Sequence, residues 1–212
     1  MDFELTPEQR EVQATVRQFV DERILPNAIE NDINHHLDMG VIEGMAELGL
    51  LGITIPEEYD GAGMDFVSEA LVCEEIERGE AAFRTLISVH VGLNSLALLH
   101  YADDEQKDRY LAPQARGEKI ACFGLTEPAA GSDVAAMRTT ARRKGDVYIL
   151  NGQKNWISYA AVADHALVDE LAHGRLHLAL LRAELEIHGP SVSRGAAPAF
   201  RRELGLGGKG RW

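Results

Sequence analysis

The sequence of 212 residues contains little of what several classes of protein require. Its only two cysteines, Cys73 and Cys122, lie far apart and have no cysteine partner at metal-ligand spacing, so we expect two buried thiols in a reducing cytoplasm. No apolar run approaches the ~18 residues that cross a bilayer. The acidic start, MDFELTPEQR, also lacks the basic end and apolar stretch of a signal peptide. These absences predict a cytoplasmic protein without a membrane partner.

Positive charge is also scarce. The chain has 21 Lys and Arg against 34 Asp and Glu, a net charge of −13, whereas binding of nucleic acid requires a basic face. The charge is uneven, because residues 1–170 contain 14 basic and 31 acidic residues while residues 171–212 contain 7 and 3. We therefore expect no nucleic-acid partner, and we note a change of composition close to Val168.

The remaining composition is that of a globular protein, 45% hydrophobic and 26% charged, enough for one large domain or two small ones. The sequence from Thr6 to Gln9 has the pattern of a capping box and precedes apolar residues at helical spacing. Further helices are predicted over residues 41–50, 66–78 and 83–101, and after Asp103. The helix over 83–101 is apolar on nearly every side, which predicts a central position.

At Ile120 the hydrophobic period changes from 3.6 residues to 2. The segments IACFGLTE and RTTARRKGDVYILNGQKNWISYA are strand-like, with one turn predicted at Lys144-Gly145-Asp146. Asn151-Gly152, between VYIL and QKNWIS, is the strongest short-range signal for a β-hairpin. Residues 1–118 are therefore predicted to be an α-helical domain, and residues 120–168 the opening of an antiparallel β domain.

The loop CFGLTEPAAGSD, residues 122–133, combines small side chains with hydroxyl groups. Pro128 stops a helix or ladder, and Gly131 with its alanine neighbours allows the backbone to approach a flat or anionic ligand. Thr126 and Ser132 supply hydrogen-bond donors. On the expected hairpin, Lys154, Trp156 and Ser158 alternate onto one face and could enclose a planar heterocycle. The alternative is a tight turn beside a core tryptophan.

Taken together, CFGLTEPAAGSD and LNGQKNWIS resemble the two flavin-contacting signatures of the acyl-CoA dehydrogenase family. GLLGITIPEEYDGAG, CEEIER and ADDEQKDRYLAPQARGEKIACFGLTEP are similar to the family too, and the resemblance covers residues 2 to about 168. It implies an α+β chain: a helical N-terminal domain over residues 1–118, and a partial antiparallel β-barrel-like middle domain over residues 119–168. FAD would lie between the middle domain and a C-terminal four-helix domain.

The resemblance also implies roles for individual residues. Thr126 would hydrogen-bond the pyrimidine side of the flavin, and Ser132 would lie near the phosphates of FAD and of the acyl-CoA substrate. Trp156 would lie against the flavin where electrons leave, and Ser158, where threonine is usual, would reach its N5 region. Ala129 stands where many members have glycine. The implied FAD-binding residues are Phe123, Gly124, Leu125, Thr126, Gly131, Ser132, Trp156, Ile157 and Ser158.

The family's reaction removes two hydrogens from an acyl-CoA thioester. A glutamate base takes the α-proton, the β-hydrogen passes as hydride to flavin N5, and an electron-transfer flavoprotein then takes the electrons. That base belongs to the C-terminal domain, so we assign no catalytic residue and expect a truncated form with weak or no flavin retention and little activity. The family also implies a homo-oligomer, a tetramer. The alternatives are a non-catalytic remnant or subunit, and a flavin monooxygenase with the same fold.

The stretch FRTLISVHVGL resembles the glutaryl-CoA dehydrogenase branch, in which an arginine faces the acyl tail. Arg84 would then pair with a carboxylate of the substrate. The alternative is a surface arginine paired to a nearby glutamate.

Residues 169–212 lose the expected strand alternation and are predicted to form a helix followed by a loop, as a divergent or frame-shifted tail. Residues 205–210, GLGGKG, match a dinucleotide-binding pattern, but no helix follows to bind a pyrophosphate. His173 and His177 have helical i,i+4 spacing without a third ligand, so surface histidines are expected and no metal is predicted.

Overall fold

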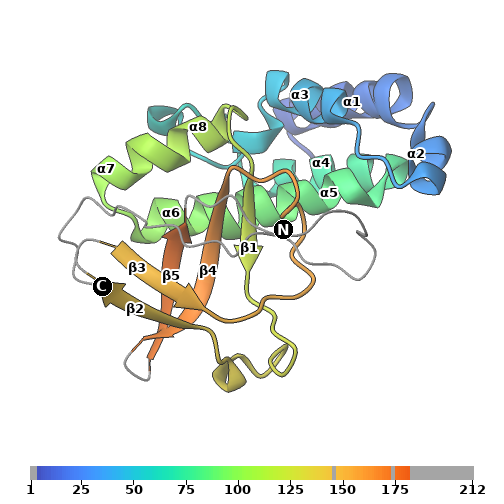
Figure 1. Cartoon of the computed structure of the whole chain (residues 1–212). Coiled ribbons are helices and arrows are strands. Elements are labelled where there is room, and N and C mark those ends of the chain that lie inside the picture. Colours follow the sequence, from blue (N-terminus) through green and yellow to red (C-terminus); the bar gives the residue numbers. More distant parts are fainter. Residues whose placement is uncertain (1–3, 145–146, 173–174, 182–212) are drawn as a thin grey trace. The chain divides into compact units, whose positions relative to one another are not determined.

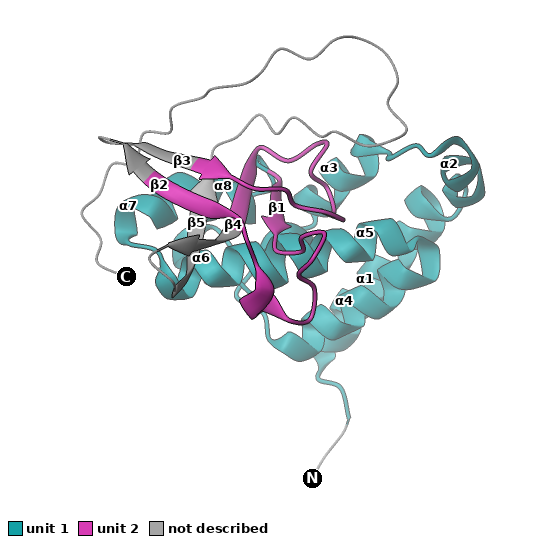
Figure 2. Cartoon of the chain, turned by 60° about the horizontal axis from the view of Figure 1, so that its bottom comes forward, with its two compact units in different colours: residues 1–119 teal, residues 120–212 magenta. Residues whose placement is uncertain are grey.

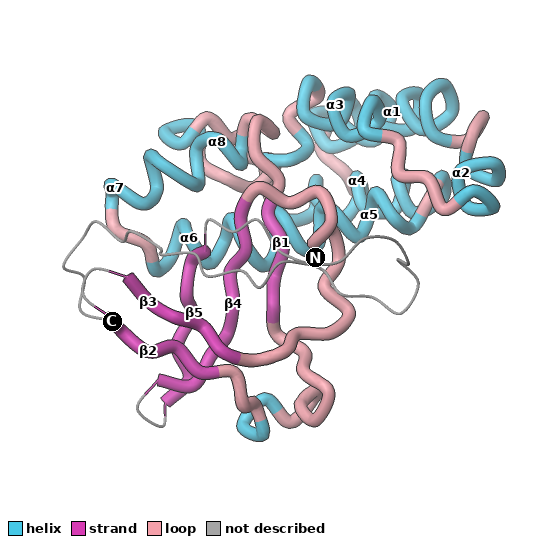
Figure 3. The backbone as a smooth tube through the Cα atoms, viewed as in Figure 1, coloured by secondary structure: helices cyan, strands magenta, loops and turns pink. Residues whose placement is uncertain are grey.

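The structure, a computed structural model, describes residues 4–144, 147–172 and 175–181 (Figure 1). The chain divides into two compact units, residues 1–119 and 120–212 (Figure 2). The division falls where the hydrophobic period of the sequence changes from 3.6 to 2 residues. Unit 1 is helical and unit 2 contains the strands, so the chain belongs to the α+β class (Figure 3).

Unit 1 begins with the predicted capping box. Thr6 Oγ1 accepts a hydrogen bond from the backbone N–H of Gln9 at 3.1 Å, and Gln9 Oε1 accepts from the Thr6 N–H at 3.0 Å. A second box, from Asp103 to Gln106, starts the last helical stretch as expected. The main helices are α1 (Pro7–Phe19), α2 (Ala28–Asn34), α3 (Met39–Glu47), α4 (Phe66–Gly79), α5 (Ala81–Leu86), α6 (Leu96–Tyr101), α7 (Asp104–Gln106) and α8 (Ala112–Ala115). The short, polar helix α2 was not predicted, because it lacks an apolar stripe that faces the core.

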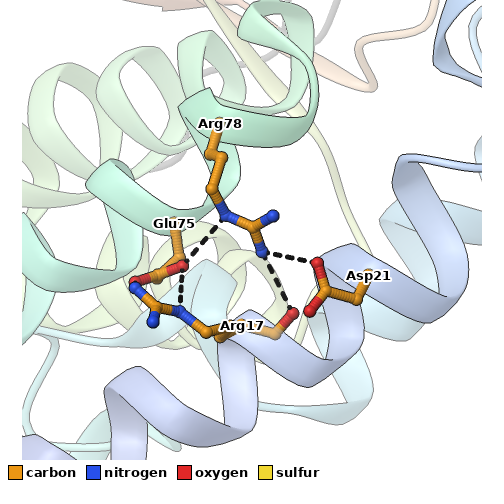
Figure 4. A network of polar contacts seen from close by, with 4 residues as sticks. All are labelled: Arg17, Asp21, Glu75 and Arg78. Atoms are coloured by element: carbon orange, nitrogen blue, oxygen red, sulfur yellow. Dashed lines mark hydrogen bonds and ion pairs between the residues drawn. The ribbon is translucent and has the colours of Figure 1, made fainter.

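An ion-pair network joins α1 to α4 (Figure 4). The Arg17 guanidinium donates to both oxygens of Glu75, at 2.6 and 3.0 Å, and Arg78 bridges Glu75 to Asp21. Glu75 is 1% exposed, and its pKa is lowered chiefly by the hydrogen bond from Arg17. The network was not predicted, although Glu75 lies in the sequence between Val72 and Ile76, two side chains of the core.

The predicted central helix is present. α5, the π-helical segment η4 (Ile87–Ser95) and α6 form one continuous helix, in which Phe83, Leu86, Ile87 and Val91 are fully buried. Three polar side chains of η4 are buried as well: His90, Asn94 and Ser95. His90 Nε2 lies 3.0 Å from the carbonyl oxygen of Gln114, and Ser95 Oγ donates to Gln114 Oε1 at 3.2 Å. These bonds fasten the central helix to α8.

The same helix corrects one expectation about hydrophobic runs. The 21 residues from Ala81 to Tyr101 are long and apolar enough, by length and composition alone, to cross a membrane. The sequence shows no uninterrupted apolar run over this segment, because Arg84, His90 and Asn94 lie within it. The core helix of a globular domain passes the same test, and much of this helix is buried in the structure.

Unit 2 contains a mixed five-stranded sheet: β1 (Ala121–Gly124), β2 (Thr140–Lys144), β3 (Val147–Asn151), β4 (His165–Ala172) and β5 (Arg175–Leu181). The order is β1-β4-β2-β3, with β5 also paired to β4. β2–β3 and β4–β5 are antiparallel, but β4 is parallel to both β1 and β2. The prediction of an all-antiparallel sheet is therefore wrong, and the described strands form a small open sheet that does not confirm a barrel-like domain. β4 is parallel to β1 because the loop after β3 returns the chain to the start of β1 before β4 begins (Figure 3).

The two cysteines differ in burial. Cys122 is buried in the core of unit 2 with Ala166 and Val168, as predicted, whereas Cys73 is half-buried. Burial raises the pKa of each thiol to about 11. Both thiols are therefore protonated at neutral pH and are weak nucleophiles.

The hairpin predicted at Asn151-Gly152 is not formed. β3 ends at Asn151, no strand lies between residues 152 and 164, and β3 pairs with β2 in a register where Lys144 faces Val147. Gly152 has no positive φ, which a tight hairpin turn of this type requires. A Cβ at Gly152 would lie 2.7 Å from the Cα of Thr139, so this glycine permits a close approach of two segments instead. The turn predicted at residues 144–146 lies partly outside the described residues.

The helix predicted after residue 168 is also wrong. β4 continues to Ala172, and β5 runs antiparallel to it, with Leu171 opposite Leu176. The sequence RLHLALL has leucine at every second position, but its leucine and alanine content favours a helix by propensity, and pairing in the sheet overrides that preference. His177 therefore lies in a strand, so the expected helical spacing is absent. His173 and residues 205–210 lie outside the described residues.

Candidate functional site

The site is built first from the bend that follows β1. Glu127 and Ala130 exchange two backbone hydrogen bonds, at 2.8 and 3.2 Å, which close a tight turn around Pro128 and Ala129. β1 already ends at Gly124, so Pro128 lies in the loop beyond the strand and does not itself end the pairing. Pro128, Ala129, Gly131 and Ser132 are exposed, whereas Ala130 is buried. The exposed small residues therefore form the outer surface of the bend.

A buried carboxylate holds this bend from within. Glu127 Oε2 accepts a hydrogen bond from the backbone N–H of Arg138 at 2.6 Å, and Oε1 accepts from the N–H of Thr139 at 2.9 Å. The ammonium group of Lys154 lies 2.9 Å from Oε1, with the Lys154 side chain 13% exposed and that of Glu127 5%. The carboxylate thus joins three segments of unit 2.

The electrostatics of Glu127 follow from these contacts. Burial alone would raise the pKa of the carboxyl, but donors from Thr139, Arg138 and Lys154 outweigh it and lower the pKa to about 2. Glu127 is therefore ionised throughout the physiological range. Its role was not predicted, although Glu127 follows directly after the hydroxyl-bearing Thr126 in the motif.

The second segment, Lys154 to Ser158, lies directly beside the bend. Lys154 Nζ donates to the carbonyl oxygen of Leu125 at 3.0 Å, and the Asn155 N–H donates to the carbonyl oxygen of Thr126 at 2.8 Å. The two motifs, some thirty residues apart in the sequence, are therefore joined through both side chain and backbone. The segment is a loop, so Lys154, Trp156 and Ser158 do not share the face of a strand.

Trp156 projects away from the body of unit 2. Its side chain is 88% exposed, so it is not the core tryptophan of the alternative interpretation. Its φ of 60° lies in the left-handed region, which a bulky L-residue rarely adopts. The backbone at this position is therefore held by its neighbours, and the indole is presented on the surface immediately after a residue hydrogen-bonded to the bend.

The other predicted cofactor residues lie in the same two segments. Phe123, Leu125, Thr126 and Ser158 are half-buried and Gly124 is buried. Ile157 is half-buried and packs against the core cluster around Cys122. A Cβ at Gly131 would meet no atom within 4 Å, so open space adjoins the bend. An exposed indole, hydroxyl groups and open space beside a glycine suit a planar heterocycle.

Arg84, the predicted substrate residue, lies in unit 1. Its Nε is 2.5 Å from Glu77 Oε2, and its Nη1 donates to Ser88 Oγ at 3.2 Å. The hydrogen bond that Arg84 donates to Glu77 raises the pKa of the guanidinium further above its usual value. The pair with a nearby glutamate is the arrangement that the alternative interpretation predicted, and the side chain remains 35% exposed.

Comparison with known proteins follows the same division of the chain. Residues 6–118 match the family described as acyl-CoA dehydrogenase, N-terminal domain, and residues 122–189 match acyl-CoA dehydrogenase, middle domain. The second match extends beyond residue 168, into the segment predicted to diverge. The two matched ranges meet close to the boundary between the compact units.

Individual relatives agree with the family match. Glutaryl-CoA dehydrogenase of Desulfococcus multivorans is 41% identical over 82% of this chain and 47% of its own length. The short-chain specific acyl-CoA dehydrogenase of Clostridium acetobutylicum is 39% identical over 77% of this chain and 43% of its own length. The chain thus spans less than half the length of these curated relatives.

Solved structures give the same result. A glutaryl-CoA dehydrogenase from Mycobacterium smegmatis in complex with FADH2 has a TM-score of 0.81 and 39% identity, covering 85% of this chain and 46% of that one. A structure described as the electron transferring flavoprotein of Acidaminococcus fermentans has a TM-score of 0.83 and 37% identity, covering 87% and 50%.

Proposed function

The chain belongs to the acyl-CoA dehydrogenase family, and on this premise we propose that it provides the helical and flavin-facing parts of an FAD-dependent acyl-CoA dehydrogenase. The reaction is the α,β-dehydrogenation of an acyl-CoA thioester. The observation that supports this most directly is the contact between the bend at residues 125–132 and the segment at residues 154–158. Asn155 donates to Thr126 there, which holds the residue that precedes the exposed Trp156 against the hydroxyl-bearing bend.

We propose that these residues bind FAD, and their chemistry supports this. Bound FAD would accept the hydride that leaves the substrate. On the protein side, the hydroxyl of Thr126 supplies a donor for a polar ring edge, and the exposed Ser132 supplies one for a phosphate. The indole of Trp156 offers a flat apolar surface for a ring system. Gly131 leaves the backbone accessible to a large ligand.

We assign no general base among the described residues. Glu127 is the buried carboxylate closest in sequence to the bend's hydroxyls, but three donors hold it ionised, and its pKa of about 2 makes it a weak base. The family resemblance implies that the base belongs to a C-terminal domain. We therefore propose that the base lies outside the described residues.

For the substrate, we propose that Arg84 faces the carboxylate of a dicarboxylic acyl-CoA. The glutaryl-CoA dehydrogenase relative supports this choice, and so does the partial exposure of the side chain. A guanidinium has five N–H donors, and the hydrogen bonds to Glu77 and Ser88 use two of them. The remaining donors suit a second carboxylate.

The electron acceptor is proposed to be an electron-transfer flavoprotein. The related Acidaminococcus fermentans structure, whose description names such a protein, supports this choice. We further propose a cytoplasmic homo-oligomer, a tetramer as the family implies, in which FAD and the acyl-CoA substrate are bound.

The absorbance of the purified chain tests the proposed function. At saturating concentration of FAD the protein should quench the fluorescence of the flavin and shift its visible absorbance, even if the cofactor is lost when the excess is removed. Protein that stays colourless, and that does not quench the fluorescence of FAD at saturating concentration, would contradict the proposal for this chain and favour a non-catalytic subunit.

Substitution of Arg84 tests the substrate class. Arg84→Ala should weaken binding of glutaryl-CoA by about tenfold, because a charge-assisted hydrogen bond is lost, and should leave butyryl-CoA binding within about twofold. Isothermal titration calorimetry with both thioesters measures the difference. Arg116→Ala, which removes the exposed pairs to Asp60 and Glu118, is the matched control. An equal loss of affinity for both thioesters would contradict the proposal and show that Arg84 does not recognise the carboxylate of the substrate.

A further inference from the structure

The contact between the two motifs of unit 2 depends on one buried ion pair. Five contacts connect the bend with its surroundings: Glu127 with Lys154, Glu127 with the N–H of Arg138 and with that of Thr139, Lys154 with the Leu125 carbonyl, and Asn155 with the Thr126 carbonyl. Glu127 or Lys154 takes part in four of these contacts. The fifth involves Asn155, the residue immediately after Lys154.

The geometry leaves this pair little freedom. Lys154 Nζ lies 3.0 Å from the Leu125 oxygen and 2.9 Å from Glu127 Oε1, so one ammonium group binds two points of the bend, on either side of Thr126. Both side chains are buried, which strengthens the interaction and makes loss of either partner costly. The distance between Thr126 and the segment that carries Trp156 is thereby set.

The backbone of Trp156 adds a reason for such a constraint. Its φ of 60° is unfavourable for a bulky residue, so the chain would relax if its neighbours were free. Asn155 and Lys154, the two residues before it, are both bonded to the bend. Their bonds therefore hold the backbone of Trp156 in a conformation that the free chain would leave.

We propose that Glu127 and Lys154 are positioning residues: their ion pair fixes the indole of Trp156 relative to the hydroxyl of Thr126 and so prepares the flavin site. The part that concerns the flavin rests on the proposed function. Neither residue takes a proton or an electron in this scheme. Their effect is to hold the two segments in place before binding, which lowers the entropic cost of ordering them when a ligand binds.

Two substitutions remove the pair in different ways. Lys154→Met keeps the length of the side chain but removes the charge and both hydrogen bonds. In the unmodified chain the two carboxylate oxygens of Glu127 accept from three donors. Glu127→Gln keeps the shape of the side chain but replaces one of these oxygens by an NH₂ group, which is itself a donor and must face one of the three donors. Lys154→Arg keeps the charge and donors, and should restore part of what Lys154→Met loses.

The experiment measures hydrogen exchange and FAD affinity on the whole chain. Without FAD, exchange of the Arg138, Thr139 and Asn155 amides should accelerate at least about tenfold in Lys154→Met and in Glu127→Gln. The dissociation constant for FAD, measured by quenching of its fluorescence, should rise at least about tenfold in both. Arg17→Met, which removes a partner of the buried Glu75 in unit 1, is the matched control and should leave FAD affinity within about twofold.

The outcomes separate the pair from the proposed function. Unchanged exchange in both variants would overturn the proposal, and faster exchange with unchanged FAD affinity would show that the pair is structural only. If the unmodified chain binds no FAD, the proposed function fails. The fluorescence anisotropy of Trp156 then tests whether Glu127 and Lys154 position its side chain. The chain has two tryptophans, so Trp212→Phe isolates this signal. A fall in anisotropy in both variants supports positioning, and an unchanged value refutes it.

Discussion

Glu127 is a buried side chain whose charge persists to unusually low pH. The donors around it lower its pKa from the usual 4.5 to about 2, against the opposing effect of burial. A carboxyl with a lowered pKa in the folded state stabilises that state above its unfolded pKa. This stabilisation is lost as the pH falls from about 4.5 towards 2.

The first prediction, at the scale of the residue, is therefore a pH dependence. Glu127→Gln should destabilise unit 2 by on the order of 2 kcal/mol at pH 7, because the charged acceptor is lost. The difference from the unmodified chain should shrink progressively between pH 4.5 and pH 2.5. Urea unfolding followed by Trp156 emission in a Trp212→Phe background measures it at each pH. A difference that stays constant down to pH 2.5 would show that Glu127 is not the group that titrates.

Among the elements of unit 2, the loop after β3 decides the topology. It takes the place of the predicted hairpin, carries Lys154 and Trp156, and returns the chain so that β4 lies parallel to β1. Gly152 starts this loop and lies against the Thr139 backbone, where a side chain has no room. The hairpin predicted at Asn151-Gly152 is therefore wrong, and Gly152 instead allows two segments to approach closely.

The second prediction concerns this close approach. Gly152→Ala should destabilise unit 2 by about 2 kcal/mol or more, since its Cβ would lie 2.7 Å from the Cα of Thr139 and backbone atoms would have to move. Gly131→Ala is the matched control, because a Cβ there meets nothing within 4 Å, and its stability should change by less than about 0.5 kcal/mol. Chemical denaturation of both variants makes the comparison. Similar losses for the two glycines would contradict the steric argument.

The whole molecule consists of two units with different internal chemistry. Unit 1 has a continuous apolar core around the central helix and a buried ionic network between α1 and α4. Unit 2 has a smaller core around Cys122 and relies on the Glu127–Lys154 pair to hold its loops. Domains with their own core commonly fold alone.

The third prediction follows at this scale. Residues 1–119, expressed alone, should give a helical circular dichroism spectrum and a cooperative thermal transition. Arg17→Met should lower the midpoint of that transition by several degrees, because Glu75 then keeps a buried charge with one partner fewer. A fragment without a cooperative transition would show that the helical unit depends on the remainder of the chain.

The sequence by itself determined most of the helical elements of unit 1 and the change from helical to strand-like segments at Ile120. Capping boxes at Thr6 and Asp103, and the change of period at Ile120, depend on neighbours within a few residues, so local physics is sufficient for them. The family resemblance also followed from contiguous motifs, and both domain matches agree with it.

Only the tertiary structure decided the sheet topology, the strand at residues 175–181 and the roles of Glu127 and Lys154. Parallel pairing of β1 with β4, and an ion pair between residues 127 and 154, join segments far apart in the chain. No local pattern records which distant group will neutralise a buried charge or which strand will pair with another. Those choices are made by packing, because burial is what makes an unpaired charge or backbone group costly.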